Sequence, residues 1–202
     1  MKFRTVSIGS RIYAILALMV VGFLAATWLT LIEARRGLES QKQAELTHLT
    51  ELALGIVKEE HAAALKNNIA MNEAQARAAA RIAALRYGHG DYFWINDMHP
   101  RMVMHPTRPE LNGKDLAENK DPNGKRLFME FVEVVKRDGA GFVPYEWPKP
   151  GAEKPQPKLS YVAGFAPWGW VIGTGVYIDD LQEQTAAMAR RVLIIVGLIV
   201  SI

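Results

Sequence analysis

The chain contains no cysteine among its 202 residues. It therefore has neither a disulfide nor a thiolate nucleophile, which excludes enzymes that depend on a catalytic cysteine. The sequence also lacks a Gly-x-Ser-x-Gly nucleophile elbow and a phosphate-binding glycine-rich loop, because Gly173-Thr174-Gly175 has neither the spacing nor the following lysine of such a loop. These absences remove common classes of hydrolase and nucleotide-dependent enzyme, and we expect no catalytic activity.

Acidic residues are absent before Glu33, whereas Lys2, Arg4 and Arg11 are basic. The remaining 21 of the 24 basic residues balance all 21 acidic residues, so the rest of the chain is formally neutral. A nucleic-acid footprint needs basic residues that cluster on a folded surface, and the charge pattern does not predict one. We therefore expect no nucleic-acid partner.

Charge is also absent from residues 12–32, which form one long apolar run. About 20 such residues in a helix span a hydrocarbon core of about 30 Å. We predict a transmembrane helix at 12–32, preceded by a cytoplasmic tail at 1–11. A cleaved signal peptide is the alternative, but its apolar region is typically about 7–15 residues long.

A second apolar run, residues 192–202, follows Arg190 and Arg191. It is shorter than the roughly 17–25 residues that a membrane span needs. We interpret it as the truncated start of a second transmembrane helix, which predicts a cytoplasmic signalling module beyond residue 202. Residues 33–191 then form one extracytoplasmic domain between the two helices.

The orientation of this domain does not follow from charge counts. Arg35, Arg36, Arg190 and Arg191 flank it in numbers similar to the basic residues of the N-terminal tail. Long domains are translocated largely regardless of charge, so the length of the domain favours its placement outside the cytoplasm.

Helical patterns precede the strands. Between residues 33 and 66 there is no proline, and apolar side chains recur at steps of three and four residues, namely Leu46, Leu49, Ala53, Ile56 and Ala63. Asn72 with Gln75 resembles a capping box, and an alanine-rich helix follows until Gly88 supplies a stop. We predict a helical hairpin that packs on one face of a sheet.

Residues 91–97 and 101–105 predict a β-hairpin. Consecutive aromatic residues suit a half-buried strand, and asparagine, aspartate and proline supply the turn between the two runs. Strand alternation places Tyr92 and Trp94 on one face and Phe93 and Ile95 on the other. One face can therefore line a cavity while the other packs beneath helices.

The last part of the chain predicts one helix and three strands. The helix covers residues 127–137, and the strands cover 142–147, 158–165 and 170–178, with a proline-rich loop at 149–157. The fold class that follows is α+β: a helical hairpin packed on an antiparallel sheet, with the helices on one side and transmembrane helices at both ends.

Several ordered motifs carry a resemblance to a known family. They are Tyr92-Phe-Trp-Ile-Asn, His105-Pro, Leu111-Asn-Gly-Lys-Asp, Asp121-Pro-Asn-Gly-Lys, Tyr145-Glu-Trp-Pro-Lys-Pro, Lys158-Leu-Ser-Tyr-Val and Trp170-Val-Ile-Gly-Thr-Gly-Val-Tyr-Ile-Asp-Asp. In this order they resemble the single-Cache sensor domain over roughly residues 33–184. The resemblance implies a PAS-like sheet behind a long N-terminal helix, in a receptor of the bacterial inner membrane whose sensor domain lies in the periplasm.

The same resemblance implies a function. Single-Cache proteins are mostly methyl-accepting chemotaxis receptors, with some sensor histidine kinases and cyclases, and their pocket takes small organic acids such as short-chain carboxylates. We expect a carboxylate ligand, the lipid bilayer and a second copy of the chain, in a homodimer, as partners, and no cofactor. The alternatives are the sensor half of a kinase or cyclase, a module that only dimerises or binds a periplasmic protein, and a metal-dependent enzyme.

A carboxylate needs charged donors in a site from which water is largely excluded. Lys158 lies in a strand that is otherwise aromatic and aliphatic, and we favour it as the charge partner; the alternative is that it only begins an exposed strand. Tyr161 falls on the opposite face of that strand and is a weaker candidate. Arg86 can grip a carboxylate bidentately, or it can lie at a helix C-terminus as a cation that suits the helix dipole.

Aromatic side chains are the candidates for the wall of the site. Tyr92 and Trp94 can offer a phenol and an indole N–H, and Tyr145 and Trp147 share one face of a later strand. For each of them, ordinary core packing is the alternative. His105 can donate to an anion, although a single histidine there also suits a structural role.

A metal site is suggested by residue types alone and not by their spacing. His89, His99, His105, Asp91 and Asp97 are metal-binding residue types, but their spacings match no zinc or calcium signature. We therefore predict no metal.

Overall fold

The computed structural model describes residues 8–88, 90–178, 190–191 and 194. The chain divides into two compact units, Met1–Ser40 with Glu183–Ile202 and Gln41–Gln182, and the α+β architecture belongs to the second unit. The predicted second membrane segment lies outside the described residues, except for Ile194.

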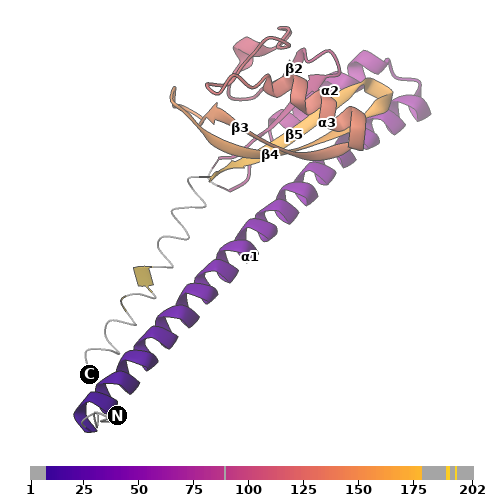
Figure 1. Ribbon diagram of the computed structural model, residues 1–202. Coiled ribbons are helices and arrows are strands. Elements are labelled where there is room, and N and C mark those ends of the chain that lie inside the picture. The colour runs from indigo at the N-terminus through magenta and orange to yellow at the C-terminus, as the bar shows by residue number, and fades with distance from the viewer. Residues whose placement is uncertain (1–7, 89, 179–189, 192–193, 195–202) are drawn as a thin grey trace. The chain divides into compact units, whose positions relative to one another are not determined.

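The helix α1 runs without interruption from Ile8 to Asn67. Its first part contains a stretch that is long and apolar enough to cross a membrane, by length and composition alone. The helix ends where Asn68 adopts a φ of 52°, in the left-handed region that asparagine tolerates better than most residues. The predicted long helix over residues 33–66 is confirmed (Figure 1).

Within the second unit, α1 buries one stripe of side chains at alternating steps of four and three residues: Leu46, Thr50, Ala53, Val57, Glu60 and Ala64. The helix α2, Met71–Ala83, buries Ala74, Ala78 and Ile82. Small alanine side chains let helices approach closely.

The start of α2 differs from the prediction. The helix begins at Met71, and its N-cap Ala70 makes no side-chain hydrogen bond. Asn72 already lies inside the helix, where its Oδ1 accepts the backbone N–H of the adjacent Glu73 at 3.0 Å. The capping box predicted at Asn72 and Gln75 is therefore wrong.

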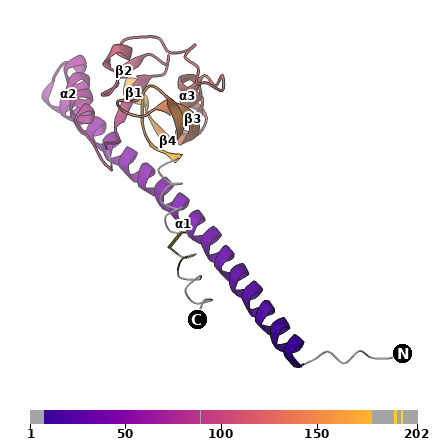
Figure 2. The ribbon, with the colours of Figure 1, turned by 90° about the vertical axis from the view of Figure 1, so that its left-hand side faces the viewer.

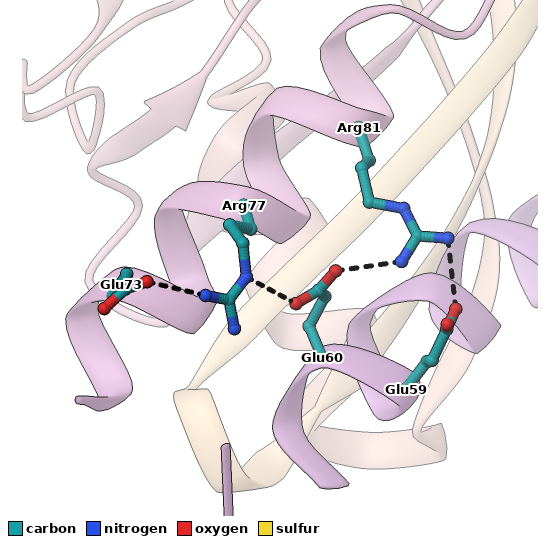
Figure 3. Close-up of polar contacts among 5 residues, drawn as sticks. All are labelled: Glu59, Glu60, Glu73, Arg77 and Arg81. Carbon is teal, nitrogen blue, oxygen red and sulfur yellow. Dashed lines mark hydrogen bonds and ion pairs between the residues drawn. The ribbon is translucent and has the colours of Figure 1, made fainter. Parts of the chain in front are cut away.

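A charged network joins α1 to α2 (Figure 3). The carboxylate of Glu60, on α1, accepts from Arg77 Nε and from Arg81 Nη1, each at 2.9 Å. Glu73 pairs with Arg77 at 2.8 Å, and Glu59 pairs with Arg81 at 3.0 Å. The two hydrogen bonds, that from Arg77 first, hold the pKa of Glu60 below its usual value.

Five antiparallel strands form the sheet, in the spatial order β2-β1-β5-β4-β3. Their bounds are Phe93–Asp97 (β1), Met102–Met104 (β2), Ala140–Pro148 (β3), Pro155–Phe165 (β4) and Trp170–Tyr177 (β5). The 3₁₀ turns Pro109–Leu111 (η1) and Ala166–Trp168 (η2) follow β2 and β4. The last strand in the sequence is thus the central strand of the sheet.

The two faces of the sheet carry separate cores. On one face, Phe93 and Ile95 pack with Val57 of α1 and Ile82 of α2. On the other face, Tyr92 and Trp94 belong to a core that includes Leu127, Phe128, Phe131 and Val132 of the helix α3, Leu127–Asp138. Helices therefore cover both faces (Figures 1 and 2), and the prediction of helices on one side is wrong.

Most later elements agree with the sequence. The helix α3 ends at Gly139, whose φ of 79° suits glycine, and β3 places Val143, Tyr145 and Trp147 on one buried face. The strand β4 begins at Pro155, inside the predicted proline-rich loop. Prolines are tolerated there because β5 ends opposite Lys158, so the first residues of β4 pair with β3 only.

Candidate ligand-binding site

A small cavity lies between α3 and the sheet, with a volume of about 10 Å³. That volume is close to what one water molecule requires. The lining residues come from β1, β3, α3 and the segment after β2: Tyr92, Trp94, His105, Leu127, Phe128, Phe131, Tyr145 and Trp147. Five of the eight side chains predicted for the site line this cavity.

Lys158 does not line the cavity itself, but it is a buried cation that contacts two of the lining residues, Tyr92 and Trp94. Its side chain is 1% exposed, and Nζ donates to the Tyr92 hydroxyl at 3.3 Å. The ammonium nitrogen also lies 4.3 Å from the Tyr92 ring centroid and 5.7 Å from that of Trp94. Among the residues that the structure describes, no carboxylate forms a salt bridge with it.

Tyr177 completes the aromatic surroundings of Lys158 and was not among the predicted site residues. The two are paired across β4 and β5, and Nζ lies 4.7 Å from the Tyr177 ring centroid. The Tyr177 hydroxyl donates to the carbonyl oxygen of Pro148 at 2.7 Å, at the end of β3. Strand alternation from Gly173 and Gly175 would have placed Tyr177 on this face, once the pairing of β4 with β5 was known.

The Trp94 and Tyr145 side chains that line the cavity already form hydrogen bonds with other protein groups. The Trp94 indole N–H donates to Asn96 Oδ1 at 3.2 Å, so Trp94 offers its ring and not its N–H to the cavity. The Tyr145 hydroxyl shares a hydrogen bond of 3.0 Å with Ser160. Burial raises the pKa of Tyr145 well above its usual value, so this side chain stays a neutral phenol.

His105 contributes a neutral imidazole. Its Nδ1 accepts the backbone N–H of Arg108 at 3.1 Å, so a neutral ring carries its proton on Nε2. Burial, followed by the charges of Lys158 and Arg108, lowers the pKa of His105 to about 3. The Nε2–H group is therefore a donor beside the cavity that His105 lines.

Two predicted residues lie apart from this cluster. Arg86 is exposed, and its Nη1 donates to the carbonyl oxygens of Ala83 and Leu85 at 2.7 Å each, which is the helix C-terminal role given as the alternative. Tyr161 lies on the opposite face of β4 from Lys158, and its ring packs on Phe142 at 4.7 Å. The structure therefore does not place Arg86 or Tyr161 with Lys158.

The residues weighed as metal ligands do not converge in the described structure. Asp97 Oδ1 accepts the backbone N–H groups of His99 and Arg101, and His89 lies outside the described residues. Within the described ranges, no three His, Asp or Glu side chains lie close enough to hold a metal ion.

Glycines in β5 make room for the site. A side chain at Gly173 would collide with the Trp94 ring, and one at Gly175 would collide with Ser160 and the Leu159 carbonyl. The Gly173-Thr-Gly175 sequence therefore serves close packing beneath Trp94 and Ser160.

A larger cavity of about 320 Å³ lies at the other end of the β4–β5 hairpin. Its lining is glycine and apolar or aromatic side chains, among them Met98, Val135, Phe165 and Trp170. No charged side chain lines it, so it cannot balance a carboxylate. The small cavity beside Lys158 is therefore the candidate site for an anion.

Comparison with known proteins bears on this arrangement. The methyl-accepting chemotaxis protein McpP of Pseudomonas putida is 39% identical over 187 residues, which are 93% of this chain and 34% of that protein. The sensor histidine kinase MctS of Rhizobium johnstonii is 33% identical over 165 residues, 78% of this chain and 35% of the kinase. The chain thus spans about a third of the length of the curated relatives it matches.

Solved structures share the fold. A periplasmic sensor domain of a chemotaxis protein is 50% identical, with a TM-score of 0.67, over 69% of this chain and 96% of that domain. A Cache chemosensory domain described for carboxylic acid recognition is 45% identical, with a TM-score of 0.69, over 71% of this chain and 97% of that domain.

The family model for single Cache domain 2 matches residues 38–191. That range contains α2, α3, all five strands and the aromatic cluster around Lys158. The chain therefore belongs to the single Cache domain 2 family, as its ordered motifs predicted.

Proposed function

We propose that this chain is the input module of a bacterial transmembrane receptor. Residues 33–191 bind a small organic acid in the periplasm, residues 12–32 and the run from 192 are transmembrane helices, and residues 1–11 lie in the cytoplasm. The output module beyond residue 202 is a chemotaxis signalling domain, as the similarity to McpP supports. A histidine kinase output is the second candidate, because MctS shares the same region.

The observation that carries this proposal is the buried ammonium of Lys158, which has no carboxylate partner among the described residues. Burying a charge without a counterion is costly, and cation–π contacts offset only part of that cost. An ammonium has three N–H donors, and the protein hydroxyl of Tyr92 takes one of them. A ligand carboxylate supplies the missing negative charge and accepts the remaining donors, with the His105 Nε2–H group as a further donor.

The size of the site limits the ligand. A cavity of about 10 Å³ is smaller than even an acetate ion, so aromatic side chains must move when a ligand enters. Because α3 and β3 enclose the cavity, a ligand with few carbons beside its carboxylate requires the least movement of these walls. We therefore expect short-chain acids, with acetate, propionate, pyruvate and lactate as the first compounds to test.

Transmission to the membrane follows from the position of β5. Tyr177 is the last residue of β5, and its ring rests against the ammonium that binds the ligand. A carboxylate that draws Lys158 toward itself changes this contact, and thereby the end of the strand that precedes the proposed second transmembrane helix. Signalling then requires two conformations at the C-terminal end of β5 that bind the ligand with different affinities.

A binding experiment on residues 33–191 tests the proposal. The solved sensor domain with 50% identity matches 69% of this chain and shares the fold as a separate periplasmic domain. We expect heat on titration with at least one of the four acids, and thermal stabilisation by it. In Lys158→Met we expect a loss of affinity of at least about tenfold, because a charged hydrogen bond contributes about 1.5–3 kcal/mol.

The matched control is Lys154→Met, which removes the same charge from an exposed position of the β3–β4 loop. It should bind like the wild-type domain. An absence of heat and of stabilisation with all four acids would count against a carboxylate sensor, as would unchanged affinity in Lys158→Met.

A further inference from the structure

The aromatic side chains beside the cavity form a row with a cation at each end. The Arg108 guanidinium carbon lies 5.2 Å from the Trp147 ring centroid, and the Trp147 and His105 centroids are 5.9 Å apart. The His105 and Tyr92 centroids are 5.0 Å apart, and Lys158 Nζ lies 4.3 Å from the Tyr92 centroid. The three rings between the cations all line the small cavity.

The two ends of this row differ in exposure. Lys158 is 1% exposed, whereas Arg108 is half-buried and reaches the surface. An anion that approaches from solvent therefore meets Arg108 before it meets Lys158.

Within the described ranges, the Arg108 side chain has no anionic partner. In the described part of the chain its guanidinium makes no ion pair and no hydrogen bond. Four other arginines of the same unit are paired with carboxylates: Arg77, Arg81, Arg126 and Arg137. A guanidinium that rests on an aromatic face keeps its N–H fork free for a planar carboxylate.

The backbone around Arg108 is fixed. Its N–H donates to His105 Nδ1 at 3.1 Å, and its carbonyl oxygen accepts from the Leu111 N–H at 3.0 Å. The charge of Arg108, like that of Lys158, helps to lower the pKa of His105, so the positive field of both cations reaches the ring between them. The row is thus positive at both ends and contains no acidic group.

We propose that Arg108 is the entrance cation of the ligand site: it attracts a carboxylate from solvent and passes it along the Trp147–His105–Tyr92 row to Lys158. This inference rests on the proposed function. Because Arg108 contacts the approaching ligand and Lys158 holds the bound one, Arg108 sets the association rate, whereas Lys158 sets the dissociation rate.

Stopped-flow tryptophan fluorescence on the full 202-residue chain in nanodiscs tests this assignment, because Trp94 and Trp147 line the cavity. The probe is the acid that binds the wild-type chain most tightly. In Arg108→Gln we expect the association rate to fall about threefold to tenfold at low ionic strength, with the dissociation rate nearly unchanged. The difference from wild type should vanish near 1 M salt, where the Debye length is about 3 Å.

Two further variants separate charge from packing. Arg108→Lys keeps the charge and should restore most of the association rate. Arg101→Gln removes an exposed arginine of the neighbouring turn, which is outside the row, and should behave like wild type.

Equal association rates for wild type and Arg108→Gln would overturn the inference, and so would an equal slowing by Arg101→Gln or a failure of Arg108→Lys to restore the rate. If the wild-type chain binds none of the acids, the proposed function itself fails. If Lys158→Met loses binding while Arg108→Gln associates normally, only the entrance role fails.

Discussion

A lysine side chain that is 1% exposed and lacks a carboxylate partner in the described structure is costly to keep. Cation–π contacts contribute about 0.5–2 kcal/mol each, whereas desolvation of an ammonium costs several kcal/mol. Groups held in such unfavourable surroundings gather at functional sites more often than elsewhere. Lys158 therefore stands apart from the surface lysines of the chain, and under the proposed function a bound carboxylate offsets this cost.

His105 makes the stability of the domain depend on pH. Its folded-state pKa is about 3, below the usual 6.5, so the unfolded chain binds a proton more readily. The stabilisation is complete above pH 6.5 and is lost as the pH falls toward 3. Between pH 7 and pH 5 we expect His105 to lower the free energy of unfolding by roughly 2 kcal/mol. Urea denaturation of residues 33–191 at both pH values measures it.

The matched variant is His105→Gln, which keeps a hydrogen-bonding side chain but does not titrate. The free energy of unfolding of this variant should fall less between pH 7 and pH 5 than that of the wild type, by roughly 2 kcal/mol. This comparison holds whatever the absolute stability of the variant. An identical drop in both proteins would show that the imidazole is not held neutral.

At this scale the sequence predicted much of the site, because strand alternation alone groups residues by face. It predicted that Lys158 and Tyr161 lie on opposite faces of one strand and that Tyr92 and Trp94 share a face. The structure has both arrangements. The sequence did not select Tyr177, since that needs the pairing of β4 with β5. Nor did it show that the Trp94 N–H is occupied by Asn96, because one side-chain rotamer decides that contact.

At the scale of elements, the sequence predicted a helix or strand correctly where one local pattern determines it. The hairpin of β1 and β2, the helix α3 and its glycine stop follow from composition and spacing. The face covered by α3 could not be predicted, because both faces of the sheet are apolar and the connection permits either. The sequence did not predict the start of β4, because proline is normally excluded from paired strands. Proline is tolerated here since the first residues of β4 pair with β3 only.

The contact between α1 and α2 depends on one carboxylate. Glu60, 12% exposed at its side chain, is bound by Arg77 and Arg81 (Figure 3). We expect Glu60→Gln to lower the free energy of unfolding by about 1–2 kcal/mol, because it weakens two charged hydrogen bonds and leaves half-buried Arg77 and exposed Arg81 without their shared counterion. Denaturant unfolding of residues 33–191 at pH 7 measures this change.

Glu59→Gln is the control for this substitution. Glu59 is 65% exposed and pairs with Arg81 alone, so its loss should change stability little. Because the arginines lower the pKa of Glu60, its contribution should persist until the pH falls below the usual range for glutamate. Equal effects of the two substitutions would contradict a special role for Glu60.

At the scale of the whole molecule, the absence of cysteine permits a direct test of topology. A single cysteine at exposed Lys154 reports the side of the membrane on which the sensor domain lies. In spheroplasts we expect a membrane-impermeant maleimide to label Lys154→Cys. Deletion of residues 1–32 should release the domain from the membrane fraction on carbonate washing.

Ser7→Cys supplies the opposite reference, because residues 1–11 are proposed to lie in the cytoplasm. It should react only after the spheroplasts are lysed. Labelling of Ser7→Cys and protection of Lys154→Cys in intact spheroplasts would reverse the proposed orientation.

The central place of β5 has a consequence for how the protein is made. The β1–β2 hairpin and the β3–β4 hairpin pair with each other only through β5, whose last residue is Tyr177. No sheet can therefore close while the ribosome is still adding the first 169 residues, and closure then requires contacts between segments far apart in the sequence. We therefore expect the five-stranded sheet to stay incomplete until β5 has been synthesised, and a chain without a finished sheet passes through a narrow export channel more readily than a folded domain.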